Sequence, residues 1–185
     1  MKSMIRGAVL GLAVMLGAQA AHAQGLSFGL GGGLVLPSGT LSDGYSTGYS
    51  GSALVRVQPP TSPVGFQVDA FYTRFGLQNN VDGHGQMIGG TANAVYAFPS
   101  ASMARPYLIG GAGVYSGKTT IEGLGSSDSQ TKFGLNAGAG FDFGLGKAKL
   151  YAEGRFHAIM KGVADGSTGE EKTAYMIPIT VGLRF

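Results

Sequence analysis

The feature that most constrains the fold is a two-residue alternation of apolar side chains with polar or small ones. It is clearest in residues 133–143, where Phe, Leu and Ala fill the odd positions and Gly, Asn and Asp fill the even ones. Successive side chains of a β-strand point to opposite faces, so this pattern is typical of a strand with one apolar face. The same alternation recurs in residues 64–75, 86–98 and 148–160. The sequence therefore predicts an all-β chain.

Turn signals divide the chain into eight strand-like segments. Short connections such as "QPPTSP" and "GLGK" alternate with longer polar ones such as "KGVADGSTGEE". This rhythm predicts an antiparallel up-and-down meander that closes into an eight-stranded barrel, with the long loops at one end and both termini at the other. The predicted strands, with bounds good to about two to four residues, are 26–36, 50–58, 64–75, 86–98, 106–117, 130–144, 148–160 and 173–185.

The two faces of the strands indicate a transmembrane barrel. Gly, Asn, Asp, Glu and Arg on the polar face would make a poor hydrophobic core, whereas a membrane barrel turns its apolar face to lipid. Strands of about 11–15 residues are long enough to cross a bilayer when tilted. The parity is less clear in 26–36, 50–58 and 106–117, because glycine is frequent there. Aromatic residues near the short-turn end predict an interfacial ring of Phe28, Phe66, Tyr96, Phe98, Tyr107, Phe141, Phe143 and Phe185.

The amino-terminal segment has the pattern of a secretory signal peptide. Lys2 and Arg6 precede a short apolar run, and Ala21-His22-Ala23 is a small-x-small cleavage site. We therefore expect a signal peptide at 1–23, export through the general secretory pathway and a barrel domain at 24–185. Removal of Lys2 and Arg6 leaves 11 of the 13 basic residues against 10 acidic ones, so no basic surface for nucleic acid is expected. The chain contains no Cys, which excludes disulfides and thiolate metal sites.

Together these features resemble the small outer-membrane β-barrel proteins of Gram-negative bacteria, of the OmpA/OmpX type. The resemblance is carried by the signal peptide, the eight-strand meander, the Gly-rich segments "PYLIGGAGVY" and "GLNAGAGFDF", and the ending "IPITVGLRF". It implies a location in the cell outer membrane, contact with outer-membrane lipid and lipopolysaccharide, and passage through periplasmic chaperones and the barrel-assembly machinery. In that family a terminal aromatic residue is part of the assembly signal, a role that would fall to Phe185. A monomer is expected.

Charged residues on the polar parity should line the lumen. An ion-selective pore would carry one dominant sign at its constriction, whereas equal numbers of both signs suggest paired charges that fill a narrow interior. Eight strands leave room for little more than side chains. We therefore predict a structural network of three basic and three acidic lumen residues, namely Arg56, Asp69, Asp142, Glu153, Arg155 and Arg184.

The sequence gives little support for catalysis or for a cofactor. Some small outer-membrane barrels are lipid A hydrolases with a His and a Ser two residues apart on a lipid-facing strand, but Ile159 follows His157 here, and His157 has the polar parity. No catalytic residue, metal site or cofactor site is predicted. The acidic loop residues Asp82, Asp165, Glu170 and Glu171 lack calcium-loop spacing. They suggest a further hypothesis, that divalent cations bridge the loops to lipopolysaccharide.

Three functions remain open from the sequence. The first is a non-enzymatic outer-membrane barrel for envelope integrity, adhesion or surface interaction. The second is a narrow porin-like channel, or a conduit for small or hydrophobic molecules, and the third is a secreted soluble ligand-binding barrel.

Overall fold

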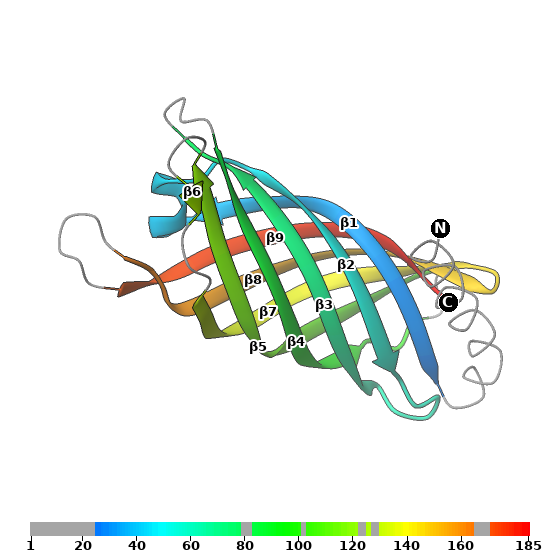
Figure 1. Cartoon of the computed structure of the whole chain (residues 1–185). Helices are drawn as coiled ribbons and strands as arrows, with labels where there is room; N and C mark the ends of the chain where they lie inside the picture. Colours follow the sequence, from blue (N-terminus) through cyan, green and yellow to red (C-terminus); the bar gives the residue numbers. More distant parts are fainter. Residues whose placement is uncertain (1–24, 79–82, 101–102, 122–124, 127–129, 165–170) are drawn as a thin grey trace, which may run out of the picture.

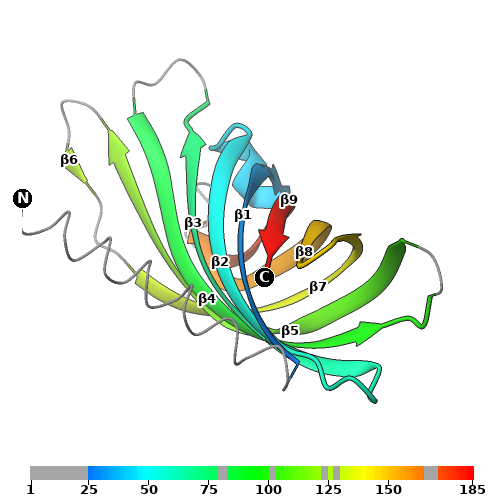
Figure 2. The ribbon, with the colours of Figure 1, turned by 90° about the vertical axis from the view of Figure 1, so that its right-hand side faces the viewer.

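The chain forms one closed antiparallel β-barrel (Figures 1 and 2). The computed structural model describes residues 25–78, 83–100, 103–121, 125–126, 130–164 and 171–185. Eight long strands form the wall: β1 (Leu26–Ser38), β2 (Gly48–Val57), β3 (Val64–Gly76), β4 (Gly83–Ala97), β5 (Ala104–Ile121), β7 (Gln130–Leu145), β8 (Ala148–Ala164) and β9 (Glu171–Arg184). Within the described ranges, no helix is long and apolar enough to cross a membrane.

Each wall strand pairs with its neighbours in the chain, and the first strand pairs with the last. The seam between β1 and β9 runs antiparallel from Gly29 opposite Arg184 to Ser38 opposite Tyr175. Beyond the end of β9, Phe28 and Phe185 exchange two backbone hydrogen bonds, of 3.0 and 2.7 Å. The predicted eight-stranded up-and-down barrel is therefore confirmed.

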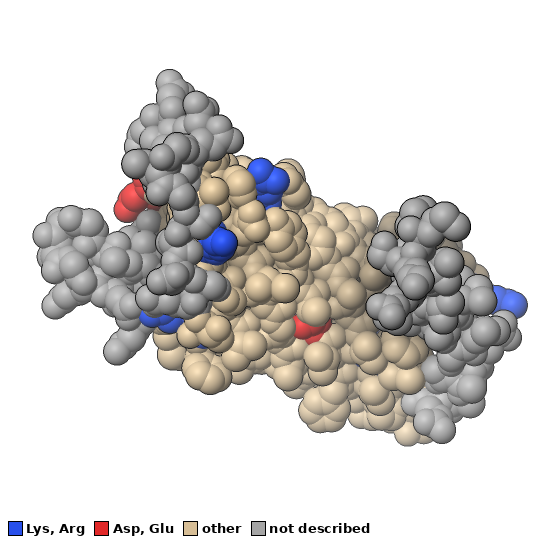
Figure 3. Space-filling view, viewed as in Figure 1, with Lys and Arg blue, Asp and Glu red and all other residues tan. Residues whose placement is uncertain are grey.

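The lipid-facing and interior faces are also as predicted. On β3, Phe66 and Val68 are 65% and 59% exposed, whereas Gln67 and Asp69, which alternate with them, are buried. Phe133 on β7 is 72% exposed, but Asn136 is buried. In the face that Figure 3 shows, most Lys and Arg side chains lie toward the long-loop end, one more lies at the opposite end, and the wall between is uncharged apart from one acidic spot. The apolar parity thus faces outward along the whole wall, as a lipid bilayer requires.

Several strands continue further toward the long-loop end than the hydrophobic pattern indicated. β5 extends to Ile121 and β8 to Ala164, through residues such as Lys118 and Thr119 that we expected in loops. Backbone hydrogen bonds to a neighbouring strand keep these polar extensions in the β conformation, so they form without an apolar face. Two small elements were not predicted: a 3₁₀-helix, η2 (Gly39–Asp43), between β1 and β2, and the short β6 (Gly125–Ser126), which pairs with the end of β5.

One residue assigned to the aromatic ring was placed on the wrong face. Tyr107 is 1% exposed and points into the barrel, whereas Phe66, Phe141 and Phe185 are 65%, 50% and 48% exposed on the outer surface. The outward face of β5 is formed by residues such as Leu108 and Val114. Because glycine is frequent in this strand, the alternation of apolar and polar residues did not show which face Tyr107 occupies.

Small residues make the space that the inward-pointing tyrosine needs. A Cβ atom added at Gly140 on β7 would lie 2.5 Å from both Cζ and the hydroxyl oxygen of Tyr107. The same Cβ atom would lie 2.7 Å from the backbone carbonyl oxygen of Ala152, which cannot move aside as a side chain can, so the glycine is a packing requirement of the interior. Gly154 on the adjacent β8 has no such neighbour within 4 Å of an added Cβ.

The lipid face is tested by a charge at mid-strand. Ala137 lies in the middle of the outward apolar row of β7, so Ala137→Arg should reduce the free energy of unfolding by about 2–4 kcal/mol. The control, Thr131→Arg, lies on the same face near the long-loop end and should cost only about 0–1 kcal/mol. Urea unfolding in lipid bilayers measures both. Equal costs at the two positions would contradict the depth assignment.

The packing of Tyr107 is tested by a pair of glycine variants. Gly140→Ala should cost about 1–3 kcal/mol of unfolding free energy, because the new methyl group overpacks the interior against Tyr107. Gly154→Ala should be neutral or should stabilise by up to about 1 kcal/mol, because it reduces the entropy of the unfolded chain. The same unfolding measurement compares them, and a Gly140→Ala variant as stable as Gly154→Ala would show that the tyrosine does not occupy this position.

Candidate functional site

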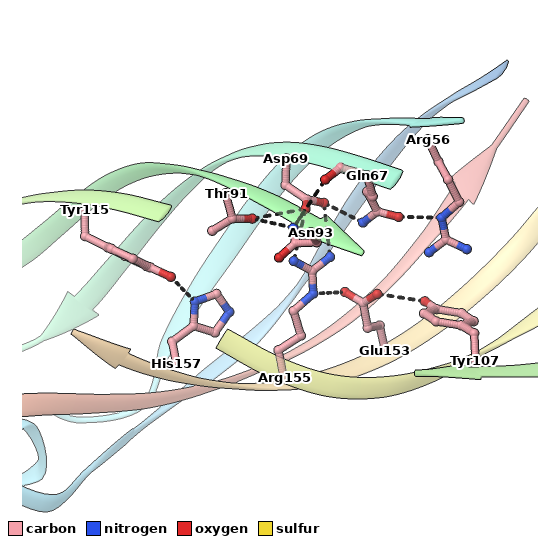
Figure 4. A network of polar contacts seen from close by, with 10 residues as sticks. All are labelled: Arg56, Gln67, Asp69, Thr91, Asn93, Tyr107, Tyr115, Glu153, Arg155 and His157. Carbon is pink, nitrogen blue, oxygen red and sulfur yellow. Dashed lines mark hydrogen bonds and ion pairs between the residues drawn. The ribbon is translucent and has the colours of Figure 1, made fainter. Parts of the chain in front are cut away.

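The interior of the barrel contains a group of polar side chains from β2, β3, β4, β5 and β8 (Figure 4). All six charged residues that the sequence placed in the lumen are buried, with exposed fractions between 2% and 7%. The structure divides them into two groups. One group lies around Arg155 in the middle of the barrel, and the other lies around Asp142 toward the short-turn end.

Arg155 holds two carboxylates at the centre of the barrel. Its Nη1 and Nη2 donate to the two oxygens of Asp69 at 3.0 and 3.1 Å, which is a bidentate pair across the lumen from β8 to β3. Its Nε donates to Glu153 Oε1, two residues away on the same strand. A planar guanidinium is suited to this geometry because its donors form a rigid fork.

Neutral polar side chains complete the hydrogen bonds of Asp69. Asn93 Nδ2 donates to Asp69 Oδ2 at 2.7 Å, and Thr91 Oγ1 donates to the same oxygen at 3.1 Å. Gln67 Nε2 donates to the other oxygen at 2.7 Å. The carboxylate thus receives donors from three strands, and this compensates for its removal from water.

A second set of contacts joins the central group to Arg56. Tyr107 donates its hydroxyl hydrogen to Glu153 Oε2 at 2.8 Å, and the Arg56 guanidinium carbon lies 4.4 Å from the centre of the Tyr107 ring. Arg56 Nε donates to Gln67 Oε1 at 2.6 Å. Tyr107 and Gln67 therefore bridge the two groups of charges, one through its ring and hydroxyl and the other through its amide.

The group at the short-turn end has two arginines and one carboxylate. Arg56 Nη1 lies 3.4 Å from Asp142 Oδ2, and Arg184 Nη2 donates to that same oxygen. The central group, in contrast, has two carboxylates for one arginine. The lumen charges balance in sum, as the sequence indicated, but they are separated along the barrel.

His157 lies in the interior beside the central group and not on the lipid face. Tyr115 Oη is 2.8 Å from His157 Nδ1, and the rings of Phe71 and Tyr115 meet the imidazole edge-on at centroid distances of 6.0 and 5.7 Å. Ile159, two residues further, is also buried inside. The arrangement has no hydroxyl nucleophile at the His + 2 position and no opening of His157 toward lipid.

An apolar cluster fills the interior at the long-loop end. It consists of Val35, Leu41, Phe75, Tyr115, Ile159, Ala174 and Met176, with Tyr45, Phe71 and Met87 packed against it. Leu41 comes from η2, which inserts it into the barrel at 3% exposure. Between this cluster and the charged network lies a cavity of about 40 Å³, which is room for a few water molecules.

Sequence reasoning identified the charges but missed the residues that organise them. Gln67, Asn93 and Thr91 carry the polar parity and could have been found by that signal. Tyr107 and Leu41 could not, because β5 is rich in glycine and η2 has no periodicity. Among the described residues, no group of three or more His, Cys, Asp or Glu side chains is placed to hold a metal ion. Asp82, Asp165 and Glu170 lie outside the described residues.

Comparison with known proteins agrees with this architecture. The family model of the outer membrane protein beta-barrel domain matches residues 8–185, nearly the whole chain. The chain belongs to this family. Its members are barrels of the outer membrane, and the cell outer membrane is the location that the family indicates for this one. The resemblance to small outer-membrane barrels is thereby confirmed.

A solved structure shows the same fold. Neisserial surface protein A (NspA) is 22% identical, with a TM-score of 0.63 over 86% of this chain and 96% of that one. The N-terminal barrel domain of Pseudomonas aeruginosa OprF is 20% identical (TM-score 0.49; 88% and 98% covered), and Yersinia pestis Ail, the attachment invasion locus protein, is also 20% identical (0.48; 86% and 96%). A search of curated proteins gives no significant match.

The central ion pair is tested by removing its arginine. Arg155→Gln should reduce the unfolding free energy of the barrel by about 3–5 kcal/mol, because Asp69 and Glu153 would remain buried without a countercharge. As a control, Lys147→Gln in the exposed β7–β8 turn should change it by less than about 0.5 kcal/mol. A double-mutant cycle with Asp69→Asn should show coupling, and additive effects would reject the Arg155–Asp69 pair.

Proposed function

We propose that the protein is a non-enzymatic surface component of the outer membrane that acts through its long-loop end, in envelope integrity or adhesion. The observation that carries this proposal is the filled interior. Among the described residues, an apolar cluster and a charged network of buried side chains occupy the interior, which supports a barrel that does not conduct solutes. What the protein offers to other molecules is then its outer surface.

The first long connection supports this proposal, because it is fixed in place. Leu41 anchors η2 in the apolar cluster, and Tyr45 Oη lies 2.5 Å from Thr119 Oγ1 of β5. The Ser46 N–H donates to the Gly76 carbonyl at 3.0 Å. A loop that is ordered before binding loses less conformational entropy when it meets a partner, and this favours recognition. Asp43 and Thr47 remain exposed on this platform.

The alternatives receive less support. A channel or conduit would require displacement of both the apolar cluster and the ion pairs. A soluble ligand-binding barrel would bury its apolar side chains, whereas here they face outward. Catalysis of the hydrolase type would need a nucleophile next to His157 on the lipid side, and His157 faces Tyr115 and Phe71 in the interior instead.

The biogenesis of the barrel follows from the same proposal. We place a signal peptide at residues 1–23, outside the described part of the chain, directly before β1, which begins at Leu26. The product is a monomer in contact with outer-membrane lipid and lipopolysaccharide, after delivery by periplasmic chaperones to the barrel-assembly machinery. Phe185 is proposed as part of the assembly signal. Its ring is 48% exposed on the outside, and its backbone closes the seam with Phe28.

Complementation of a deletion strain tests the surface function. One variant replaces residues 42–47 by a Gly/Ser sequence and keeps the Leu41 anchor, and a control variant carries Thr61→Ala in the exposed β2–β3 turn at the opposite end. We expect the loop variant to reach the outer membrane normally but to lose the adhesion or detergent resistance that the intact protein restores. The purified protein should show no steady conductance in planar bilayers. Full complementation by the loop variant together with a stable conductance would instead assign the function to the lumen.

Deletion of Phe185 tests the assembly signal. In purified detergent, loss of one interfacial ring should cost no more than about 1.5–3 kcal/mol of apolar burial. In cells, the same deletion should leave protein in the periplasm, where proteases act on unassembled chains. Phe185→Tyr keeps the ring and should assemble normally, as cell fractionation would show. Normal amounts of the deletion variant in the outer membrane at low expression would contradict the proposed role.

A further inference from the structure

The mouth of the barrel at the short-turn end contains a second, larger cavity. Its volume is about 260 Å³, which is room for a small anion and several water molecules. Five basic side chains line it, together with the single acidic side chain of Asp142: Arg56, Arg105, Lys147, Lys149 and Arg184. Phe185 also lines it. The cavity therefore has a clear excess of positive charge.

The two deepest cations in this cavity are incompletely satisfied. Arg56 and Arg184 are 2% and 4% exposed, and both reach the same oxygen of Asp142. Arg56 Nη2 and Arg184 Nη1 are buried and have no hydrogen-bond acceptor among the described residues. The second oxygen of Asp142 is also buried without a donor. Unsatisfied donors on buried charges are costly, which points to a missing acceptor.

No other carboxylate of the described interior is available to supply that acceptor. Glu153 already accepts from Arg155 Nε and from the Tyr107 hydroxyl. Asp69 is held by Arg155 and by three neutral side chains on β3 and β4. The mouth therefore has an excess of positive charge because two of the three lumen carboxylates are paired with Arg155 at the centre of the barrel.

We propose that this mouth is a binding site for a phosphate group. The unpartnered Nη atoms of Arg56 and Arg184 would donate to the phosphate oxygens, since guanidinium forks match that geometry. Lys147 and Lys149 are exposed at the rim, and together with Arg105 they would attract the anion toward the cavity. The phosphate could come from an anionic phospholipid of the surrounding leaflet or from a phosphorylated solute. This site does not depend on the proposed surface function.

A titration with inorganic phosphate tests the site. The protein is purified from outer membranes in non-ionic detergent, and amide NMR signals are followed at constant ionic strength set with chloride. We expect saturable shifts at Arg56, Gln58 and Arg184, with little change near Lys118 at the other end of the barrel. The double variant K147Q/K149Q should weaken the apparent affinity at least 5-fold. Arg184→Lys, which keeps the charge but loses the fork, should weaken it as well.

The control variant is K118Q, which removes an exposed lysine from β5 at the long-loop end. It should bind phosphate like the unchanged protein. Shifts that do not saturate, or that weaken equally in K118Q and in K147Q/K149Q, would overturn the proposal by showing only a counterion atmosphere. The absence of any shift at the mouth would also overturn it, because water then satisfies the buried nitrogens.

The source of the phosphate is distinguished in lipid nanodiscs. If phosphatidylglycerol nanodiscs produce the mouth shifts without added phosphate and phosphatidylcholine nanodiscs do not, the site binds a lipid headgroup. If added phosphate is required in both, the site binds a soluble phosphorylated molecule. Either result supports the site, provided that the shifts are lost in the K147Q/K149Q variant.

Discussion

The closure of the sheet is the constraint on which the rest of this structure depends. In a bilayer no water is available to pair an exposed backbone N–H or C=O group, so a sheet can cross only if its first and last strands meet. Here β1 and β9 meet along a register that runs from Gly29 opposite Arg184 to Ser38 opposite Tyr175, and Phe28 with Phe185 extends it. With eight strands, closure also sets a narrow interior. Everything inside must then be packed or paired.

The interior meets this requirement differently at different depths. Near the long-loop end it is apolar and is completed by Leu41 from η2. At the centre, one arginine joins two carboxylates with several neutral donors, beside a cavity of about 40 Å³. Toward the short-turn end, two arginines share one carboxylate next to an open cavity. The apolar cluster at one end and the excess of basic side chains at the other support the proposal that the barrel acts through contacts at its two ends.

The separation of charges shows why a net count says little about a lumen. The three basic and three acidic residues would cancel if they were mixed. Because Arg155 recruits both Asp69 and Glu153, only Asp142 is left for Arg56 and Arg184. Tyr107 and Gln67 connect the two groups, and the glycine at 140 makes space for the tyrosine ring. The excess of positive charge at the mouth thus results from the ion pairs that form in the middle of the barrel.

The sequence alone determined the features that depend on local periodicity: the number of wall strands, their approximate bounds, the outward apolar face and which six charges lie inside. Side-chain alternation encodes these because it distinguishes one face of a strand from the other. It does not encode which residues meet across the lumen. Asp69 and Arg155 are 86 positions apart on β3 and β8, which are not neighbours in the sheet, so only the closed barrel brings them together. The tertiary structure also determines that Tyr107 points inward and that Leu41 inserts into the barrel. In glycine-rich β5 and in η2, local sequence carries no parity, and the space left by the surrounding wall determines where these side chains point.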